Sequence, residues 1–280
     1  MVERILVTGG TGKTGRLVAA QLAVAGVEAI VATRHPRGPA DRLFDWSRPE
    51  GFAAALDGVD GVYLVAPTDR TDHLAAMRPL LALAVARVPG QLVLLSASPL
   101  ARGGPLMGEV HAWLADHAPR WTVLRPSWFM QNFVTERLPA IVHQHAVISA
   151  TDDGRVPFID AADIAASAVA VLTDPDRASR EHILTGPETL SYGDVAALLS
   201  DVTGRTIRHH RLSTSALAAH YVSLGLAPDY APALAAMDAA IAGGSEDRLT
   251  TDVAALTGRP PRTLRAFLEA HRALLRGEES

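Results

Sequence analysis

The first 125 residues alternate between two kinds of hydrophobic pattern. Five short runs are almost continuously apolar and rich in β-branched residues, which is typical of buried strands. These runs cover residues 4–8, 27–33, 61–66, 91–96 and 121–125. Between them, apolar residues recur at helical spacing in the segments 14–25, 49–56, 72–88 and 105–117. Strands that are apolar on both faces and alternate with helices predict an α/β fold, a doubly wound parallel sheet of the Rossmann type.

The pattern is less regular after Pro126. Strands are predicted at 158–159, 183–185 and 207–212, helices at 161–172 and 192–202, and a mostly helical remainder. We therefore predict a Rossmann-type domain at 1–130, completed by 157–175. A smaller, mostly helical substrate-binding lobe is predicted at 131–156 and 176–280.

Composition and charge exclude several classes of function. The chain has 280 residues, a formal net charge of -4 and no cysteine, so disulfides, thiolate metal sites and a catalytic thiol are ruled out. No basic stripe indicates nucleic-acid binding, and no apolar run is long enough to span a membrane. Because no signal peptide is recognisable, we expect a cytoplasmic protein with a small-molecule substrate. Whether it is a monomer or a homodimer stays open.

A glycine-rich loop follows the first predicted strand and opens the first predicted helix. It contains G-x-G-x-x-G at Gly10, Gly12 and Gly15, and Gly9 adds a G-x-x-G-x-x-G spacing. In this context, glycines let backbone N–H groups approach a dinucleotide pyrophosphate, which the helix N-terminus attracts. Lys13, the only lysine in the chain, can add a full positive charge. The predicted pyrophosphate contacts are Gly9, Thr11, Gly12, Lys13, Thr14 and Gly15.

The residue after the second predicted strand bears on the choice between NAD and NADP. An acidic residue about 20 positions beyond the motif is typical of NAD-specific folds. Arg34 stands there instead and can pair with a 2′-phosphate, so we expect NADP(H) in preference to NAD(H). In the loop before the next helix, Asp45 is a candidate acceptor for the adenine amino group. Trp46 beside it is a candidate for cofactor contact or for the core.

Several segments carry a resemblance to a known family, in the expected order over roughly residues 3 to 200. They are 8–15, 44–46, 62–67, 94–98, 124–133, 158–164 and 184–188. Together they resemble the NmrA-like branch of the atypical short-chain dehydrogenases/reductases, close to bacterial relatives of the festuclavine dehydrogenase-type ergot alkaloid reductases. The resemblance implies an NAD(P)H-dependent reductase, with Ala66, Pro67 and Pro126 beside the cofactor.

Orthodox members of that superfamily use a tyrosine, a lysine four residues later and a serine from the fourth strand. This chain cannot form the Tyr–Lys pair. The residues four positions after Tyr63, Tyr192, Tyr221 and Tyr230 are Pro67, Ala196, Gly225 and Leu234. His111 occupies the place of the lysine and is the candidate ribose contact or proton donor, while Ser96 can hold the substrate or the nicotinamide amide. The alternatives are a helix-face histidine bonded to backbone and a serine that simply closes a strand.

The missing pair has a chemical meaning. Reduction of a ketone needs a proton for the developing alkoxide, and a positioned acid contributes strongly to it. Reduction of an iminium needs only hydride, and a quinone can take its proton from water or a weak acid. The chain therefore suits iminium, enone or quinone acceptors, or no chemistry at all.

Large apolar residues gather directly after the fifth predicted strand. The resemblance implies that they line the pocket floor and favour a flat, apolar substrate, although the same side chains can equally belong to a core. The candidate substrate contacts are Trp128, Phe129, Asn132 and Phe133. Asp160 and Asp163 have the spacing of a helix N-cap and its third position, so we interpret them as capping residues. No histidine pair has the spacing of a metal site, and we predict no metal.

The leading hypothesis is an NADPH-dependent reductase of a small, apolar, conjugated acceptor, with iminium and enone groups ahead of simple ketones. A role in secondary metabolism is implied by the resemblance. One alternative is a quinone reductase. Others are a non-catalytic NmrA-like redox sensor that regulates a partner, and a reductase fold that performs a non-redox reaction.

Overall fold

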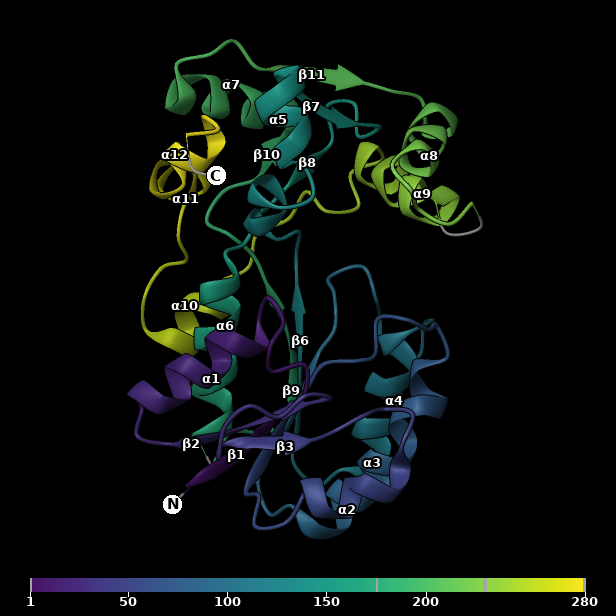
Figure 1. Ribbon diagram of the computed structural model, residues 1–280, viewed down its shortest axis with the longest axis vertical. Coiled ribbons are helices and arrows are strands. Elements are labelled where there is room, and N and C mark those ends of the chain that lie inside the picture. The colour runs from purple at the N-terminus through teal and green to yellow at the C-terminus, as the bar shows by residue number, and fades with distance from the viewer. Residues whose placement is uncertain (1, 175, 229–230, 279–280) are drawn as a thin grey trace. The chain divides into compact units, whose positions relative to one another are not determined.

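The computed structural model describes residues 2–174, 176–228 and 231–278, and the chain forms two compact units. Unit 1 comprises Met1–Pro126, Ala161–Leu184 and Thr251–Pro260. Unit 2 comprises Ser127–Asp160, Thr185–Thr250 and Pro261–Ser280. Each unit is therefore assembled from segments that are far apart in the sequence (Figure 1).

Unit 1 is built on a seven-stranded parallel sheet with the order β3-β2-β1-β4-β5-β6-β9. The strands are β1 (Arg4–Val7), β2 (Glu28–Thr33), β3 (Asp41–Leu43), β4 (Gly61–Leu64), β5 (Leu92–Leu95), β6 (Trp121–Pro126) and β9 (Arg180–Leu184). The order reverses between β1 and β4. In doubly wound sheets, ligands bind at this switch point, outside the carboxyl ends of the strands.

Helices cover both faces of this sheet because its central strands are apolar on both sides (Figure 1). On one face, α2 (Phe52–Ala55), α3 (His73–Arg87) and α4 (Met107–His117) share one hydrophobic core with the strands. On the other face, α1 (Gly15–Val24) packs on α6 (Ala161–Leu172), which also contacts α10 (Asp252–Thr257). The short 3-10 helix η1 (Pro49–Gly51) precedes α2.

Unit 2 combines helices with two small sheets of two strands each. In the first, β7 (Ala146–Ser149) is parallel to β11 (Arg208–Arg211), and in the second, β8 (Arg155–Val156) is antiparallel to β10 (Leu190–Ser191). The helices are η2 (Met130–Val134), α5 (Leu138–Gln144), α7 (Tyr192–Thr203), α8 (Thr214–Ser223), α9 (Ala231–Ala242), α11 (Leu264–Ala270) and α12 (Arg272–Leu275). A core around Phe133, Phe158 and Tyr192 holds most of them together.

The predicted doubly wound α/β fold is confirmed, and the elements of the first 126 residues lie close to their predicted bounds. Three differences have local causes. β3 is a three-residue edge strand with the polar sequence Asp-Arg-Leu, so no hydrophobic pattern marks it. β9 begins at Arg180, three residues before the predicted start, because its first two residues are polar and exposed and so lack a hydrophobic pattern. The predicted strand at 158–159 is a single bridge between Phe129 and Ile159.

The compact units also divide the chain differently from the predicted domains. Residues 180–184 extend the sheet of unit 1 as β9, and residues 251–260 join unit 1 through α10. The physical link is Asp252, whose carboxylate accepts a hydrogen bond from the backbone N–H of Ile183 at 3.1 Å and contacts His182 Nδ1 at 3.1 Å. Such a link between distant segments leaves no periodic pattern in the sequence.

Candidate functional site

The glycine loop lies between the end of β1 and the start of α1. Gly9 has a φ of +61°, a left-handed conformation that favours glycine, and its carbonyl accepts the N–H of Gly12 at 2.9 Å. A Cβ on Gly15 would come within 2.2 Å of that carbonyl, so no larger residue fits there. Thr11 is exposed and Lys13 is half-buried. No side chain caps α1 and its first turn has no acidic residue, so the partial positive charge of its N-terminus faces the loop.

A buried side chain ties this loop to β4. Thr8 Oγ1 accepts a hydrogen bond from the N–H of Val65 at 2.7 Å and donates to the carbonyl of Tyr63 at 3.1 Å. Ala66 and Pro67 follow Val65 directly, so Thr8 fixes two predicted cofactor contacts relative to the glycine loop. No sequence pattern marks this role, because a threonine directly after a strand is unremarkable by itself.

The residues predicted near the adenine end gather beyond β2. Arg34 is exposed and directly follows the strand. Two hydrogen bonds from Ser47, at 2.9 Å from its N–H and 2.7 Å from its hydroxyl, lower the pKa of Asp45, and the charge of Arg34 acts in the same direction. Trp46 packs edge-on against Phe44, with 4.9 Å between the ring centroids. Trp46 is half-buried and packs against the core of unit 1, and its contact with the cofactor stays a prediction.

Ser96 lies at the carboxyl end of β5, next to the end of β6. Its side chain is buried, and Ser96 Oγ has no hydrogen-bond partner. A buried hydroxyl without a partner costs free energy, so Ser96 Oγ, at the carboxyl edge of the sheet, is available to bond a ligand. The ladder continues past β5, because the N–H of Ser96 donates to Leu124 at 2.8 Å and the N–H of Ser98 donates to Pro126 at 2.9 Å. Pro126 is thereby placed beside Ser96, as the predicted site requires.

His111 lies on the buried face of α4, which packs on the sheet. Its ring is 5.4 Å from that of Trp121, the first residue of β6, and its Nδ1 is 3.8 Å from Glu181 Oε2. Burial lowers the pKa of His111, and the carboxylate of Glu181 acts in the opposite direction. The ring contact with Trp121 is compatible with a structural residue, but the buried Nδ1 of His111 has no hydrogen-bond partner, unlike a histidine bonded to backbone. Its catalytic role stays a prediction.

Arg125 is a buried charge beside Ser96 that the sequence reasoning did not single out. Its side chain is only 10% exposed, and its Nη1 pairs with Glu181 Oε2 at 2.8 Å. Its Nη2 donates to the carbonyl of Ser98 at 2.6 Å, and its Nε lies 3.5 Å from the carbonyl of Ala97. The only available signal was a charge in the otherwise apolar run at 121–125.

The described tyrosines do not match the acid of a Tyr–Lys pair. Burial raises the pKa of Tyr63 well above its usual range, and it raises the pKa of Tyr192 to about 12. Burial also raises the pKa of Tyr221. Tyr230 lies outside the described residues. A raised pKa makes a phenol a weaker acid, the opposite of what a neighbouring lysine achieves.

The four predicted substrate contacts belong to unit 2 and have different environments. Phe133 is 1% exposed and contacts Phe158 and Tyr192, with ring centroids 5.1 and 6.3 Å away. Trp128, Phe129 and Asn132 are half-buried. Phe133 is thus a core residue of unit 2, the alternative that the sequence left open, and the other three have surface to offer a ligand.

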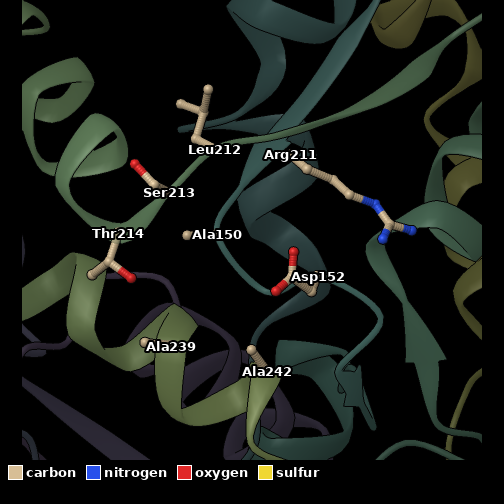
Figure 2. Close-up of a pocket in the computed structure, with 8 residues that line it drawn as sticks. All are labelled: Ala150, Asp152, Arg211, Leu212, Ser213, Thr214, Ala239 and Ala242. Carbon is tan, nitrogen blue, oxygen red and sulfur yellow. The ribbon is translucent and has the colours of Figure 1, made fainter.

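A cavity of about 490 Å³ lies elsewhere in unit 2 (Figure 2). Asp152, which follows β7, and Arg211 at the end of β11 line it on one side, and Ala239 and Ala242 of α9 line it on the other. Arg211 is already paired with Asp153. None of the substrate contacts predicted from the sequence lines this cavity.

Comparisons with known proteins identify the family. Residues 117–242 match the model of the NmrA-like family. An uncharacterized oxidoreductase of Bacillus subtilis, YesF, is 38% identical over 96% of this chain and 95% of its own length. An agroclavine dehydrogenase of Claviceps fusiformis is 39% identical over 94% of this chain and 96% of its own. The chain belongs to the NmrA-like oxidoreductases.

The fold of this NmrA-like oxidoreductase is also similar to solved structures. A crystal structure of an NADPH-dependent quinone oxidoreductase from Escherichia coli, complexed with NADPH, superposes with a TM-score of 0.84 and 24% sequence identity. The match covers 95% of this chain and 99% of the other. This likeness agrees with the parallel sheet and flanking helices of unit 1 and confirms the Rossmann-type architecture.

Acidic residues of this NmrA-like chain have structural partners. Asp160 directly precedes α6 and pairs with Arg262 at 3.2 Å, and Asp163, in the first turn of α6, pairs with Arg259 at 3.1 Å. Their capping role at the start of α6 stays a prediction. Within the described ranges, no group of three or more His, Asp or Glu side chains is placed to hold a metal ion. Over the same residues, no helix combines the length and apolarity needed to cross a lipid bilayer.

Proposed function

We propose that this NmrA-like oxidoreductase uses NADPH to reduce a small, apolar, conjugated acceptor of the iminium or enone type. The observation that carries the proposal is a dinucleotide-type loop and an unpartnered buried Ser96 hydroxyl in a chain that has no Tyr-x-x-x-Lys pair. Such a site can direct hydride transfer, but it holds no strong proton donor for an alkoxide.

The residues present fit a nicotinamide dinucleotide. The tight packing at Gly15 and the uncapped N-terminus of α1 would hold the pyrophosphate, with Lys13 adding charge. The unpartnered Ser96 Oγ is a suitable partner for the nicotinamide amide or for the acceptor. Bound NADPH would supply a hydride. The residues of the chain would bind and orient it.

NADPH is preferred over NADH because Arg34 is exposed at the end of β2. A guanidinium there can form charge-assisted hydrogen bonds to a 2′-phosphate. An acidic residue would be needed at the same place to select the 2′-hydroxyl of NADH. The nearby carboxylate of Asp45 accepts hydrogen bonds from Ser47, so the guanidinium of Arg34 is available to bind the phosphate.

The iminium class is favoured by the balance of charge in the reaction. When a hydride adds to the carbon of C=N⁺, the electron pair of the π bond moves to nitrogen and the product is a neutral amine. No proton is required in that step. An enone also accepts hydride at carbon, and its enolate takes a proton from water. The name of the agroclavine dehydrogenase relative supports a small organic substrate, and the half-buried Trp128 and Phe129 stay the candidate contacts for it.

The test is a panel of cyclic iminium ions, enones, quinones and ketones, assayed by loss of NADPH absorbance after binding of NADPH is established by calorimetry. We expect turnover of iminium ions or enones and little of simple ketones. Preferential turnover of quinones would replace the proposed acceptor class. Tight NADPH binding without turnover of any class would contradict the reductase and point to a sensing role.

A further inference from the structure

Arg125 is an unusual residue for its position in the sheet. It is the residue before the last one of β6 and follows Val123 and Leu124 in an apolar strand. Its side chain is 10% exposed. Removing a guanidinium from water is costly, and a well-packed apolar residue at such a position often gives equal or greater stability. The charge therefore calls for a reason other than stability.

The hydrogen-bond pattern beside Ser96 explains why a buried charge stands at position 125. In the register of β5 and β6, Leu124 accepts the N–H of Ser96, and the next rung would run from the N–H of residue 126 to the carbonyl of Ser96. Residue 126 is proline, which has no N–H to donate. The ladder is thus weakened at the residue whose hydroxyl is unpartnered.

The side chain of Arg125 supplies donors just beyond this gap. Its Nη2 donates to the carbonyl of Ser98 at 2.6 Å, and its Nε points to the carbonyl of Ala97. Glu181 on β9 holds the other side of the guanidinium at 2.8 Å. The planar fork of arginine is suited to bridging backbone carbonyls and a carboxylate at the same time, which lysine cannot do.

We propose that Arg125 is a positioning residue of this oxidoreductase, which holds the backbone of Ala97 and Ser98 so that the Ser96 hydroxyl keeps its place for the nicotinamide or the acceptor. This inference rests on the proposed function, because it takes Ser96 as part of the reaction site. Glu181 orients Arg125. His111 Nδ1 lies 3.8 Å from the same carboxylate.

The first test measures the position of the segment without any substrate. Amide hydrogen exchange of a peptide covering residues 92–100 is compared in wild type, Arg125→Met and Arg78→Met. Arg78 is an exposed arginine of α3 in the same unit and serves as the matched control. We expect at least about tenfold faster exchange at Ser96 and Ser98 in Arg125→Met only, with β1 and β2 unchanged. Unchanged exchange at 96–98 would overturn the inference.

The second test is a double-mutant cycle on the best acceptor of the panel. We expect Arg125→Met to lower kcat by about 10- to 100-fold with a much smaller change in KM. Ser96→Ala should lower kcat in the wild type but add little in the Arg125→Met background, because the hydroxyl is already misplaced. Fully additive losses would show that Arg125 acts independently of Ser96 and would overturn the inference.

Two further outcomes separate this inference from the proposed function. Arg125→Lys keeps the charge but replaces the planar fork with a single ammonium group, so it should give a kcat between those of wild type and Arg125→Met. It replaces the methionine variant if that protein does not fold. If no acceptor is reduced, the proposed function fails, and the exchange result alone decides whether Arg125 holds the segment. If Ser96→Ala leaves kcat unchanged in an active enzyme, the positioning role is overturned.

Discussion

In the glycine loop of unit 1 the backbone would bind the ligand, whereas in the aromatic segment 128–133 of unit 2 the side chains would. The loop is recognisable because only glycine can occupy places such as Gly15, where a Cβ would meet the carbonyl of Gly9 at 2.2 Å. The aromatic segment carries no such restriction. A phenylalanine fits a core and a ligand pocket equally well, so its type does not reveal its role.

Phe133→Ala should give the largest effect and sharpen this comparison. Phe133 is buried among Phe158 and Tyr192, and its truncation would leave a cavity. We expect the free energy of unfolding to fall by about 3–5 kcal/mol, as measured by denaturant titration. Trp128→Ala is the matched variant, since Trp128 is half-buried and should lose less stability while raising the KM for the acceptor. A larger destabilisation in Trp128→Ala would reverse the two assignments.

Gly15→Ala tests the backbone side of the comparison. The added methyl group must displace the carbonyl of Gly9 and so distort the loop that is proposed to hold the pyrophosphate. Calorimetry should show NADPH binding weakened by roughly 100-fold. In Gly38→Ala, where no atom lies within 4 Å of the added Cβ, binding should be unchanged. Equal binding in both variants would mean that the dinucleotide does not use this loop.

Arg34→Asp should change the affinity for NADPH much more than the affinity for NADH. Loss of a charge-assisted contact and repulsion by the new carboxylate should weaken NADPH binding by roughly 10- to 100-fold, with a much smaller change for NADH. Arg37→Asp, at another exposed arginine of the same loop, controls for the general change in charge. Equal losses for both cofactors in Arg34→Asp would remove this arginine from the 2′-phosphate site.

His111→Gln should have the smallest effect, visible in pH dependence. Burial lowers the pKa of His111, so the unfolded chain takes up this proton at a higher pH than the folded one. Its contribution to the free energy of unfolding is therefore present above the unfolded pKa and is lost as the pH falls towards the folded pKa. Denaturant titrations from about pH 7 to about pH 5 should show a shallower decline in the variant.

The pH profile of kcat provides the control for that prediction. A structural His111 predicts the same profile in wild type and His111→Gln. If His111→Gln loses kcat while the pH dependence of its free energy of unfolding is unchanged, His111 takes part in the reaction. The pKa of His182 is also lowered by burial, so His182 contributes to the decline of the free energy of unfolding with falling pH in both proteins.

The sequence predicted the fold and the glycine loop because both follow from local pattern. Continuous apolar strands and helical spacing are properties of short windows, and so is the glycine motif between β1 and α1. Thr8, Arg125 and Asp252 act through partners 27 to 70 residues away, as in Thr8 with Val65 and Asp252 with His182. Such contacts have no signature in a single sequence. Only the structure could distinguish the buried Phe133 from the more accessible Trp128.

The placement of α10 has a consequence for how the protein is made. Asp252 contacts β9 of unit 1, although most of that unit has been synthesised by Pro126. At roughly 5–20 residues per second, a ribosome needs roughly 6–25 s to go from Pro126 to Asp252. For that interval the nascent sheet lacks its edge strand or the helix that covers it, a state in which binding by a chaperone would do the most to prevent aggregation.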